Sequence, residues 1–190
     1  ALSAAAVDIM TRESLVQELR LLPNKVQRIL DEEEQIAQWG KYLSGYESVF
    51  FVARGISLPI ALEGALKMKE IAYIHAEGYS AGELKHGPFA LLTPDTPVIV
   101  IAPRDNSYEA LLTNIKEIGA RETPVICLAE EDDGEIEKYV RGVLRVPKVS
   151  PVLSPIVNTV TLQLLAYYAA KERGCPIDRP RNLAKSVTVE

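Results

Sequence analysis

The sequence has 190 residues, enough for one domain with a sizeable buried core. An apolar fraction of 47% and a charged fraction of 25% are typical of an ordinary soluble globular protein. The formal charge is -5 and no basic stripe offsets it, which argues against nucleic acid or an anionic membrane surface as a partner.

The cysteines and the apolar segments narrow the class further. Cys127 and Cys175 have no metal-ligand spacing, so we expect a reduced, cytoplasmic protein without a metal site. The first ten residues lack the basic leader of a signal peptide. The longest apolar stretch, Val157–Ala170, is too short and too polar to span a bilayer. No glycine-rich nucleotide loop is present, and we expect no cofactor.

The first third of the chain predicts helices around one strand. Thr11–Glu34 is expected to be helical, interrupted or restarted at Pro23, and a second helical piece covers about Ile36–Leu43. Val49–Ala53 is a short buried-strand candidate. A long helix follows from about Ser57 to Tyr73.

The alternation then continues to the last helix. Strands are predicted at Val98–Ile101, Val125–Leu128 and Val143–Val146, and helices at Tyr108–Ala120, Gly134–Tyr139 and Pro155–Arg173, the last one capped by Ser154. Continuous apolar strands separated by helices indicate an α/β fold with a parallel sheet covered on both faces.

Two segments fall outside this alternation, namely His75–Gly87 and the tail Cys175–Glu190. Segments that are not needed to build the layers are the first place to look for function. In α/β sheets, ligands bind beyond the carboxyl ends of the strands.

Glu63, Lys67 and Glu70 are spaced by four and three residues, so they share one stripe of the predicted helix. The stripe lies opposite an apolar side made by Leu58, Ala61, Leu62, Ala65 and Ala72, and Glu63 and Lys67 can form an exposed ion pair on it. Alternatively, a carboxylate beside an ammonium is suited to moving a proton between adjacent carbons.

The segment from Ser80 to His86 also has two interpretations. Ser80 and Glu83 fit a capping box, which makes Glu83 structural. His86 either ends a short helix near the negative end of its dipole or acts as a general acid/base. His75 is the other candidate for an imidazole role.

The tail reads as a solvated terminus by position, but Leu183, Val187 and Val189 favour burial. Lys185 can bind an anionic or carbonyl group, or form a Schiff base. The turn Ala53–Pro59 offers Arg54 but no cluster of hydroxyls, and is therefore a poor phosphate cradle.

Several runs together resemble the isomerase part of the glucosamine-6-phosphate synthase family, which makes glucosamine 6-phosphate from fructose 6-phosphate and glutamine. The runs are Ile60–Lys67, Lys69–Ile71, Tyr73–Glu77, Ala81–Pro88 and the highly specific terminal Pro180–Glu190. The resemblance covers essentially the whole chain and about the final third of the family's protein.

The family has a glutaminase domain and two sugar-isomerase (SIS) subdomains of flavodoxin-like topology. This chain resembles the second SIS subdomain, which implies a three-layer α-β-α sandwich with a mainly parallel five-stranded sheet. The implied divisions are a helical leader over 1–44, the SIS domain over 45–174 and an active-site tail over 175–190. The implied partners are a sugar phosphate, the missing SIS subdomain and glutaminase domain, and a second copy in a homodimer.

The resemblance also implies roles for five residues. Glu70 corresponds to the carboxylate that moves a proton between C1 and C2, and Lys67 to the neighbour that handles protons on the sugar heteroatoms. His86 corresponds to the acid/base that opens the sugar ring of substrate held mainly by the neighbouring subunit. Lys185 corresponds to the lysine that reaches the sugar and forms an imine, and Ala184 to a backbone contact.

The departures from the family matter as much. The phosphate cradle belongs to the first SIS subdomain and the glutaminase nucleophile is an N-terminal cysteine, whereas this chain begins with Ala1. We therefore expect the isolated chain to be inactive. The alternatives are a non-catalytic SIS module that binds a sugar phosphate or nucleotide sugar as a regulator, and a stand-alone aldose-ketose isomerase that works as a homodimer. A pure binding module has no need of Glu70 and Lys185.

Overall fold

The computed structural model describes residues 9–183, which form one sheet of five strands in the order β2-β1-β3-β4-β5. The strands are β1 (Ser48–Ala53), β2 (His75–Ser80), β3 (Val98–Ala102), β4 (Val125–Glu130) and β5 (Gly142–Val146). All four pairings are parallel. The predicted α/β class with a five-stranded sheet is confirmed.

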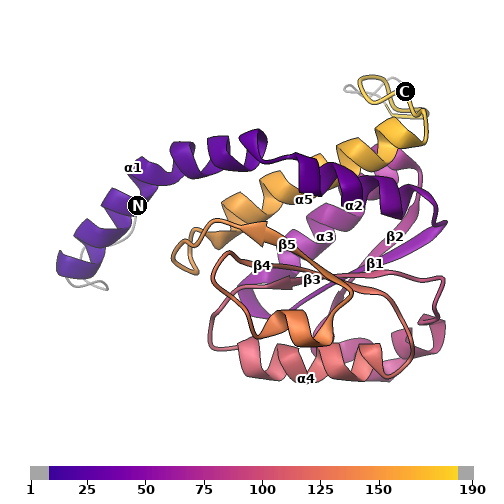
Figure 1. The fold of residues 1–190 in the computed structure, drawn as a ribbon, viewed down its shortest axis with the longest axis horizontal. Helices are drawn as coiled ribbons and strands as arrows, with labels where there is room; N and C mark the ends of the chain where they lie inside the picture. Colours follow the sequence, from indigo (N-terminus) through magenta and orange to yellow (C-terminus); the bar gives the residue numbers. More distant parts are fainter. Residues whose placement is uncertain (1–8, 184–190) are drawn as a thin grey trace, which may run out of the picture.

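Helices cover both faces of this sheet (Figure 1). The α-helices are α1 (Ile9–Asp31), α2 (Glu34–Ser44), α3 (Leu58–Lys67), α4 (Tyr108–Gly119) and α5 (Ser154–Glu172). The π-helical turn η2 (Met68–Ala72) continues α3, and the 3-10 turns are η1 (Gly55–Ser57), η3 (Ala81–His86), η4 (Pro88–Leu91) and η5 (Ile136–Tyr139). Helices α2, α3 and α5 lie on one face and α4 on the other, which makes three layers.

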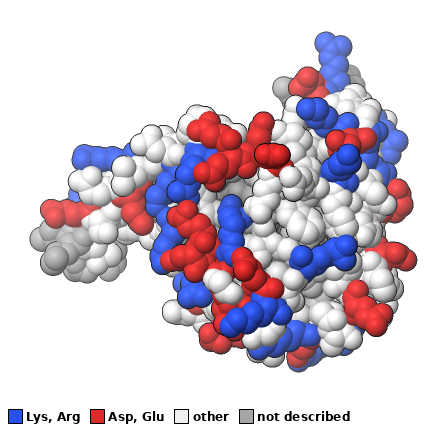
Figure 2. Space-filling model, in the orientation of Figure 1, with Lys and Arg blue, Asp and Glu red and all other residues white. Residues whose placement is uncertain are grey.

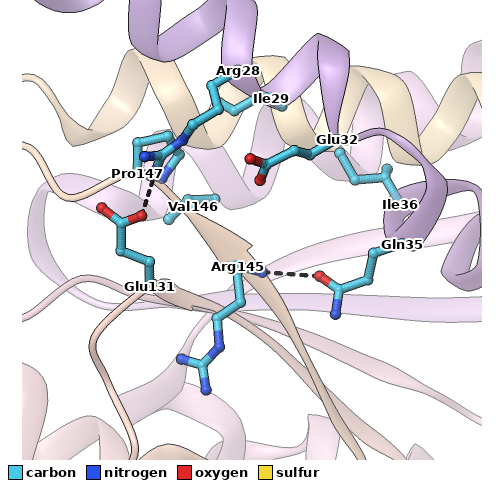
Figure 3. A pocket seen from close by; sticks show the side chains of 9 residues that line it. All are labelled: Arg28, Ile29, Glu32, Gln35, Ile36, Glu131, Arg145, Val146 and Pro147. Atoms are coloured by element: carbon cyan, nitrogen blue, oxygen red, sulfur yellow. Dashed lines mark hydrogen bonds and ion pairs between the residues drawn. The ribbon is translucent and has the colours of Figure 1, made fainter.

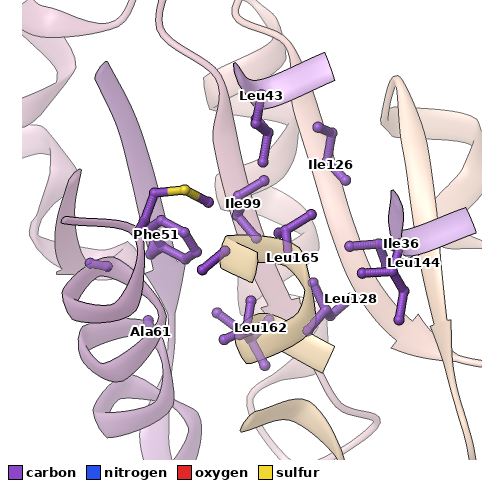
Figure 4. Packing of buried hydrophobic residues seen from close by; sticks show 14 of the residues in the cluster. Ile36, Leu43, Phe51, Ala61, Ile99, Ile126, Leu128, Leu144, Leu162 and Leu165 are labelled. Carbon is purple, nitrogen blue, oxygen red and sulfur yellow. The ribbon is translucent and has the colours of Figure 1, made fainter. Parts of the chain in front are cut away.

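The core consists of two apolar clusters, one on each side of the sheet. The larger one joins the sheet to α2, α3 and α5, and includes Phe51, Ile99 and Leu165 (Figure 4). The second includes Phe50 and Ile115 and joins the opposite face to α4. Every residue of β3 and β4 is buried, because both faces of these central strands are covered. Each fully buried large side chain contributes roughly 1.5–3 kcal/mol.

Helix α1 differs from the prediction at Pro23. The helix continues through this proline and ends at Asp31, so the expected interruption there is wrong. A proline removes one backbone donor from a helix, but the surrounding turns remain helical here. The first half of α1 projects away from the domain (Figure 1), and Val16, Leu19 and Leu21 on it are about half exposed.

Strand β2 lies in the segment that the sequence pattern left outside the alternation. It pairs with β1 along its whole length, from His75 opposite Ser48 to Ser80 opposite Ala53. Its sequence contains no β-branched residue, and it forms the edge of the sheet. Backbone pairing to β1, and not side-chain preference, therefore makes this segment a strand.

Two predicted caps are wrong. Ser80 makes no side-chain capping bond at the start of η3, so the capping box with Glu83 does not form. Helix α5 begins at Ser154 itself, with Leu153 at the N-cap position. The Ser154 hydroxyl donates to the Pro151 carbonyl at 2.9 Å, because the serine lies one position too far into the helix to cap it.

Surface charge is mixed on the face seen in Figure 2, where acidic and basic side chains alternate instead of forming one basic patch. Among the helices of residues 9–183, none combines the length and the apolar character needed to cross a bilayer.

Candidate active site

The predicted charged stripe lies where α3 passes into the π-helical turn η2. The Lys67 ammonium (Nζ) lies 2.6 Å from the Glu70 carboxylate (Oε2) and 3.7 Å from the Glu63 carboxylate (Oε1). The side chains of Lys67 and Glu70 are 28% and 29% exposed, so they are partly shielded but open to a ligand. π-Helical turns inside α-helices occur frequently at functional sites.

The surroundings of Lys67 favour its charged form. The hydrogen bond to Glu70 raises the pKa of Lys67, and the negative charges of Glu63 and Glu70 add to this effect, while burial opposes it. Lys67 is therefore an ammonium at neutral pH and can donate a proton or stabilise negative charge. Glu70 is the group of the pair that can accept a proton from carbon.

The opposite side of α3 only partly matches the prediction. Ala61 and Ala65 are buried as expected, because small residues let the helix approach the sheet and α5 closely. Leu62, expected on the buried side, is instead 50% exposed. It lies one position before Glu63 and packs beside Gly78 of β2, where an added Cβ would come within 2.8 Å of Leu62 Cδ2.

Glu70 lines an open cleft of about 500 Å³ at the end of η2. The residues that line this cleft are Leu66, Lys69, Glu70, Tyr73, Ile74, His75, Arg181, Asn182 and Leu183. The cleft thus brings the helix of the charged stripe together with the beginning of the tail, although more than 100 residues separate them in the sequence. The predicted proximity of Ala184 and Lys185 concerns residues outside the described part of the chain.

His86 lies at the other end of β2 from this cleft. It is exposed at the end of η3, which follows the carboxyl end of β2, and it is not among the residues that line the cleft. Glu70 precedes the amino end of the same strand. The six-residue strand that lies between the two segments is roughly 17 Å long. Glu70 and His86 therefore lie toward opposite ends of β2.

Two polar side chains of the cleft, Tyr73 and Lys69, were not singled out from the sequence, whereas His75, the other candidate for an imidazole role, does line the cleft. Tyr73 has φ 56° and ψ 29°, the left-handed conformation that is uncommon outside glycine. No periodicity signals such a position. The tyrosine belongs to one of the runs that carry the family resemblance, which was the only available sign.

The turn after β1 has little capacity to hold a phosphate. The Arg54 guanidinium (Nη1) donates to Asn114 Oδ1 at 2.8 Å, and Ser57 is buried at the start of α3. Within residues 9–183, no group of three or more His, Cys, Asp or Glu side chains is arranged to hold a metal ion.

A second, smaller pocket of about 60 Å³ lies between the α1–α2 junction and the end of β5 (Figure 3). Arg28 pairs with Glu131 at 2.5 Å across its mouth, and Gln35 Oε1 accepts a bond from the Arg145 backbone at 3.4 Å. These contacts tie the first two helices to the sheet, so we assign this pocket a structural role.

The parallel α/β fold agrees with a comparison of the sequence with known protein families. A family profile described as SIS domain matches residues 42–173, which is more than half of the chain. The chain therefore belongs to the SIS domain family.

The similar proteins are more specific than this class. The chain is 54% identical over 178 residues to the isomerizing glutamine–fructose-6-phosphate aminotransferase of Methanosarcina acetivorans, and 50% identical over 175 residues to that of Chlorobaculum tepidum. These alignments cover 94% and 92% of this chain but only 29% and 28% of the relatives. The chain thus spans less than a third of their length.

Solved structures with a similar fold include one of the same kind of aminotransferase. The C-terminal domain of glucosamine-fructose-6-phosphate aminotransferase from Francisella tularensis is 34% identical with a TM-score of 0.84, over 92% of this chain and 49% of that one. Tagatose-6-phosphate ketose/aldose isomerase from Escherichia coli has a TM-score of 0.75 at 18% identity, over 91% of this chain and 48% of that one. The second likeness concerns the fold alone.

Proposed function

We propose that this chain is the second SIS half of the isomerase part of a glutamine-dependent glucosamine-6-phosphate synthase. The reaction converts fructose 6-phosphate and glutamine-derived ammonia to glucosamine 6-phosphate. The observation that carries the proposal is the Glu70 carboxylate, which lines a cleft together with residues 181–183 of the tail and lies 2.6 Å from the Lys67 ammonium. The similarity to the isomerizing glutamine–fructose-6-phosphate aminotransferase of Methanosarcina acetivorans and to the aminotransferase domain from Francisella tularensis supports the proposal.

The proposed chemistry follows from these two groups. A ketose that becomes an aldose needs a proton taken from the carbon next to a carbonyl or imine, and returned to the adjacent carbon. Glu70 would perform both transfers on a ligand that is held still. Lys67, whose pKa is raised by Glu70, would supply the proton or the positive charge at the sugar oxygen or nitrogen.

The proposed assembly is a homodimer that contains the missing SIS subdomain and glutaminase domain. The separation of Glu70 and His86 along β2 supports this, because His86 would then open the ring of sugar bound mainly by the neighbouring subunit. Val16 and Leu19, three residues apart on α1 and half exposed, offer an apolar surface to such a partner. We also propose that residues 1–44 act as a helical leader to the SIS domain of 45–174.

The tail would complete the site. Residues 175–190 are proposed to bring Lys185 to the sugar carbonyl, where it would form an imine, and Ala184 to a backbone contact. Arg181, Asn182 and Leu183 line the Glu70 cleft, which supports a tail that reaches the substrate. The missing SIS subdomain would hold the substrate phosphate, so the isolated chain is expected to make no product.

The test is isomerisation of fructose 6-phosphate to glucose 6-phosphate, which needs no glutamine. We expect no activity from the chain alone and activity when the missing SIS half is added. Glu70→Gln should lower that activity by about 100- to 10,000-fold, the contribution of a general base. The matched control is Glu63→Gln, which removes a carboxylate near the same lysine but outside the cleft, and should change it less than about threefold.

Two other results would contradict the proposal. Activity from the chain alone would indicate a stand-alone isomerase with a phosphate site of its own. Inactivity after the two halves have been shown to associate would indicate a regulatory module that binds a sugar phosphate without converting it.

A further inference from the structure

The hydroxyl of Tyr73 connects the beginning of the tail to the helix that carries Glu70. It accepts a hydrogen bond from the Arg181 backbone amide at 2.8 Å. The Arg181 guanidinium carbon also lies 4.2 Å from the centre of the Tyr73 ring, within the range of a cation–π contact. One side chain thus binds both the backbone and the side chain of Arg181.

The conformation of Tyr73 aims this side chain toward the tail. Its left-handed backbone ends the π-helical turn and begins the approach to β2. A residue with a Cβ adopts this conformation at a cost of roughly 1–2 kcal/mol, which glycine avoids. A tyrosine here indicates that the side chain is needed at a position that backbone preference would assign to glycine or asparagine.

A second contact ties the tail to the same turn. The Cys175 thiol donates to the Ala72 carbonyl at 3.7 Å, and Cys175 and Ile177 pack against the larger core cluster. The segment that follows α5 is therefore held at two points: Cys175 contacts Ala72, and Arg181, six residues later, contacts Tyr73. Between these two points the chain crosses from the core to the rim of the Glu70 cleft.

The position of Arg181 limits where the rest of the tail can go. Arg181 and Tyr73 both line the cleft that contains Glu70. Asn182 and Leu183, which follow Arg181 directly, line the same cleft, so a fixed Arg181 keeps this part of the tail at the cleft. A residue that fixes Arg181 therefore raises the local concentration of whatever chemistry the tail carries.

We propose that Tyr73 is a positioning residue that holds the C-terminal segment against the Glu70 cleft. The catalytic consequence rests on the proposed function, because it assumes that Lys185 acts on a sugar in this cleft. The physical claim, that Tyr73 holds Arg181, stands independently of the reaction.

The first experiment measures this tether directly in the 190-residue chain. Hydrogen exchange of the Arg181 amide and tryptic cleavage after Arg181 are compared between the natural chain and Tyr73→Phe. Loss of the acceptor should speed both by about 2- to 10-fold, the worth of one hydrogen bond, and Tyr73→Ala should speed them further. Cleavage after Arg179 does not interfere, because Pro180 follows it.

The matched control is Tyr79→Phe, which removes a hydroxyl that donates to Glu77 and does not contact the tail. It should leave exchange and cleavage at Arg181 unchanged. Equal rates at Arg181 in the natural chain, Tyr73→Phe and Tyr73→Ala would overturn the proposal. So would a uniform acceleration at all tryptic sites with a lowered Tm, because the effect would then be global unfolding.

The second readout uses the chain complemented with the missing SIS half. Tyr73→Phe should lower kcat for isomerisation about 2- to 10-fold with little change in KM, since the phosphate would be bound elsewhere. An unchanged kcat, despite faster exchange at Arg181, would overturn the catalytic consequence alone. Absence of any activity in the natural complemented enzyme would overturn the proposed function, while the tether result would stand.

Discussion

Helices α2 and α5 meet at Gly40, where the structure leaves no room for a methyl group. A Cβ on Gly40 would lie 2.5 Å from the Cβ of Tyr168 and 3.0 Å from the backbone nitrogen of Ala169. Carbon atoms in contact are normally about 3.5–4.0 Å apart, so Gly40→Ala requires the helices to separate by about 1 Å. Neither contact is the flexible end of a side chain, and rotation cannot relieve the clash.

The magnitude follows from two opposing effects. Replacing glycine by alanine inside a helix stabilises it by about 1 kcal/mol. Overpacking a core costs about 1–3 kcal/mol, and a clash with Cβ and backbone atoms belongs at the upper end of that range. We therefore expect Gly40→Ala to lower the free energy of unfolding by about 1–2 kcal/mol, or Tm by about 2–8 °C.

Gly119→Ala is the matched control, because it is the same substitution at the last residue of α4. An added Cβ there meets nothing within 4 Å, and the backbone is not in the left-handed region. This variant should be as stable as the natural chain or more stable by up to about 1 kcal/mol.

Urea denaturation measures both variants, with circular dichroism for the helices and Trp39 fluorescence for the neighbourhood of Gly40. The two variants should differ from the natural chain in opposite directions, with unchanged m-values. A Gly40→Ala chain as stable as Gly119→Ala would refute the close approach of α2 and α5.

Two further predictions concern buried titratable groups. Asp133 is fully buried; burial raises its pKa, but bonds from Arg104 at 2.9 Å and Tyr108 at 2.6 Å outweigh this and hold the pKa below its usual range. Asp133→Asn should therefore cost about 2–3 kcal/mol in urea denaturation at pH 7, and this difference should shrink as the pH falls below about 4; a constant difference would contradict it. Burial, and secondarily the charge of Asp133, raises the pKa of the Cys127 thiol. A thiol reagent should thus label Cys175 in the folded chain and Cys127 only in urea, and rapid labelling of both would be inconsistent with the fold.

The strands at Val49, Val98 and Val125 were predictable because each is a continuous apolar run. The strand at Val143 was predictable from Val143, Leu144 and Val146, although it contains Arg145 and lies at the other edge of the sheet. Central strands of a parallel sheet are buried on both faces, so burial leaves a mark on every residue of the run. Strand β2 has no continuous apolar run, and only one of its residues is buried. It lies at the edge, and its hydrogen bonds to β1 decide its conformation.

Part of the candidate site was also predictable from the sequence, and part was not. Helical spacing predicted that Lys67 would lie beside Glu63 and Glu70, and both ion pairs are present. Spacing did not predict the exposure of Leu62, because it depends on which direction α3 presents to the sheet and to α5. The roles proposed for Glu70 and Lys67 came from the family resemblance and stay predictions until the isomerase assay is done.

The sequence by itself determined the α/β class, most of the element boundaries and the family to which the chain belongs. These depend on local periodicity and on runs of residues that are read one after another. Only the tertiary structure decided that His75–Ser80 forms strand β2, that Glu70 lines a cleft, and that Tyr73 contacts Arg181. Each of these depends on contacts between segments that are remote in sequence or on a backbone conformation, and a one-dimensional pattern does not encode which remote segments meet.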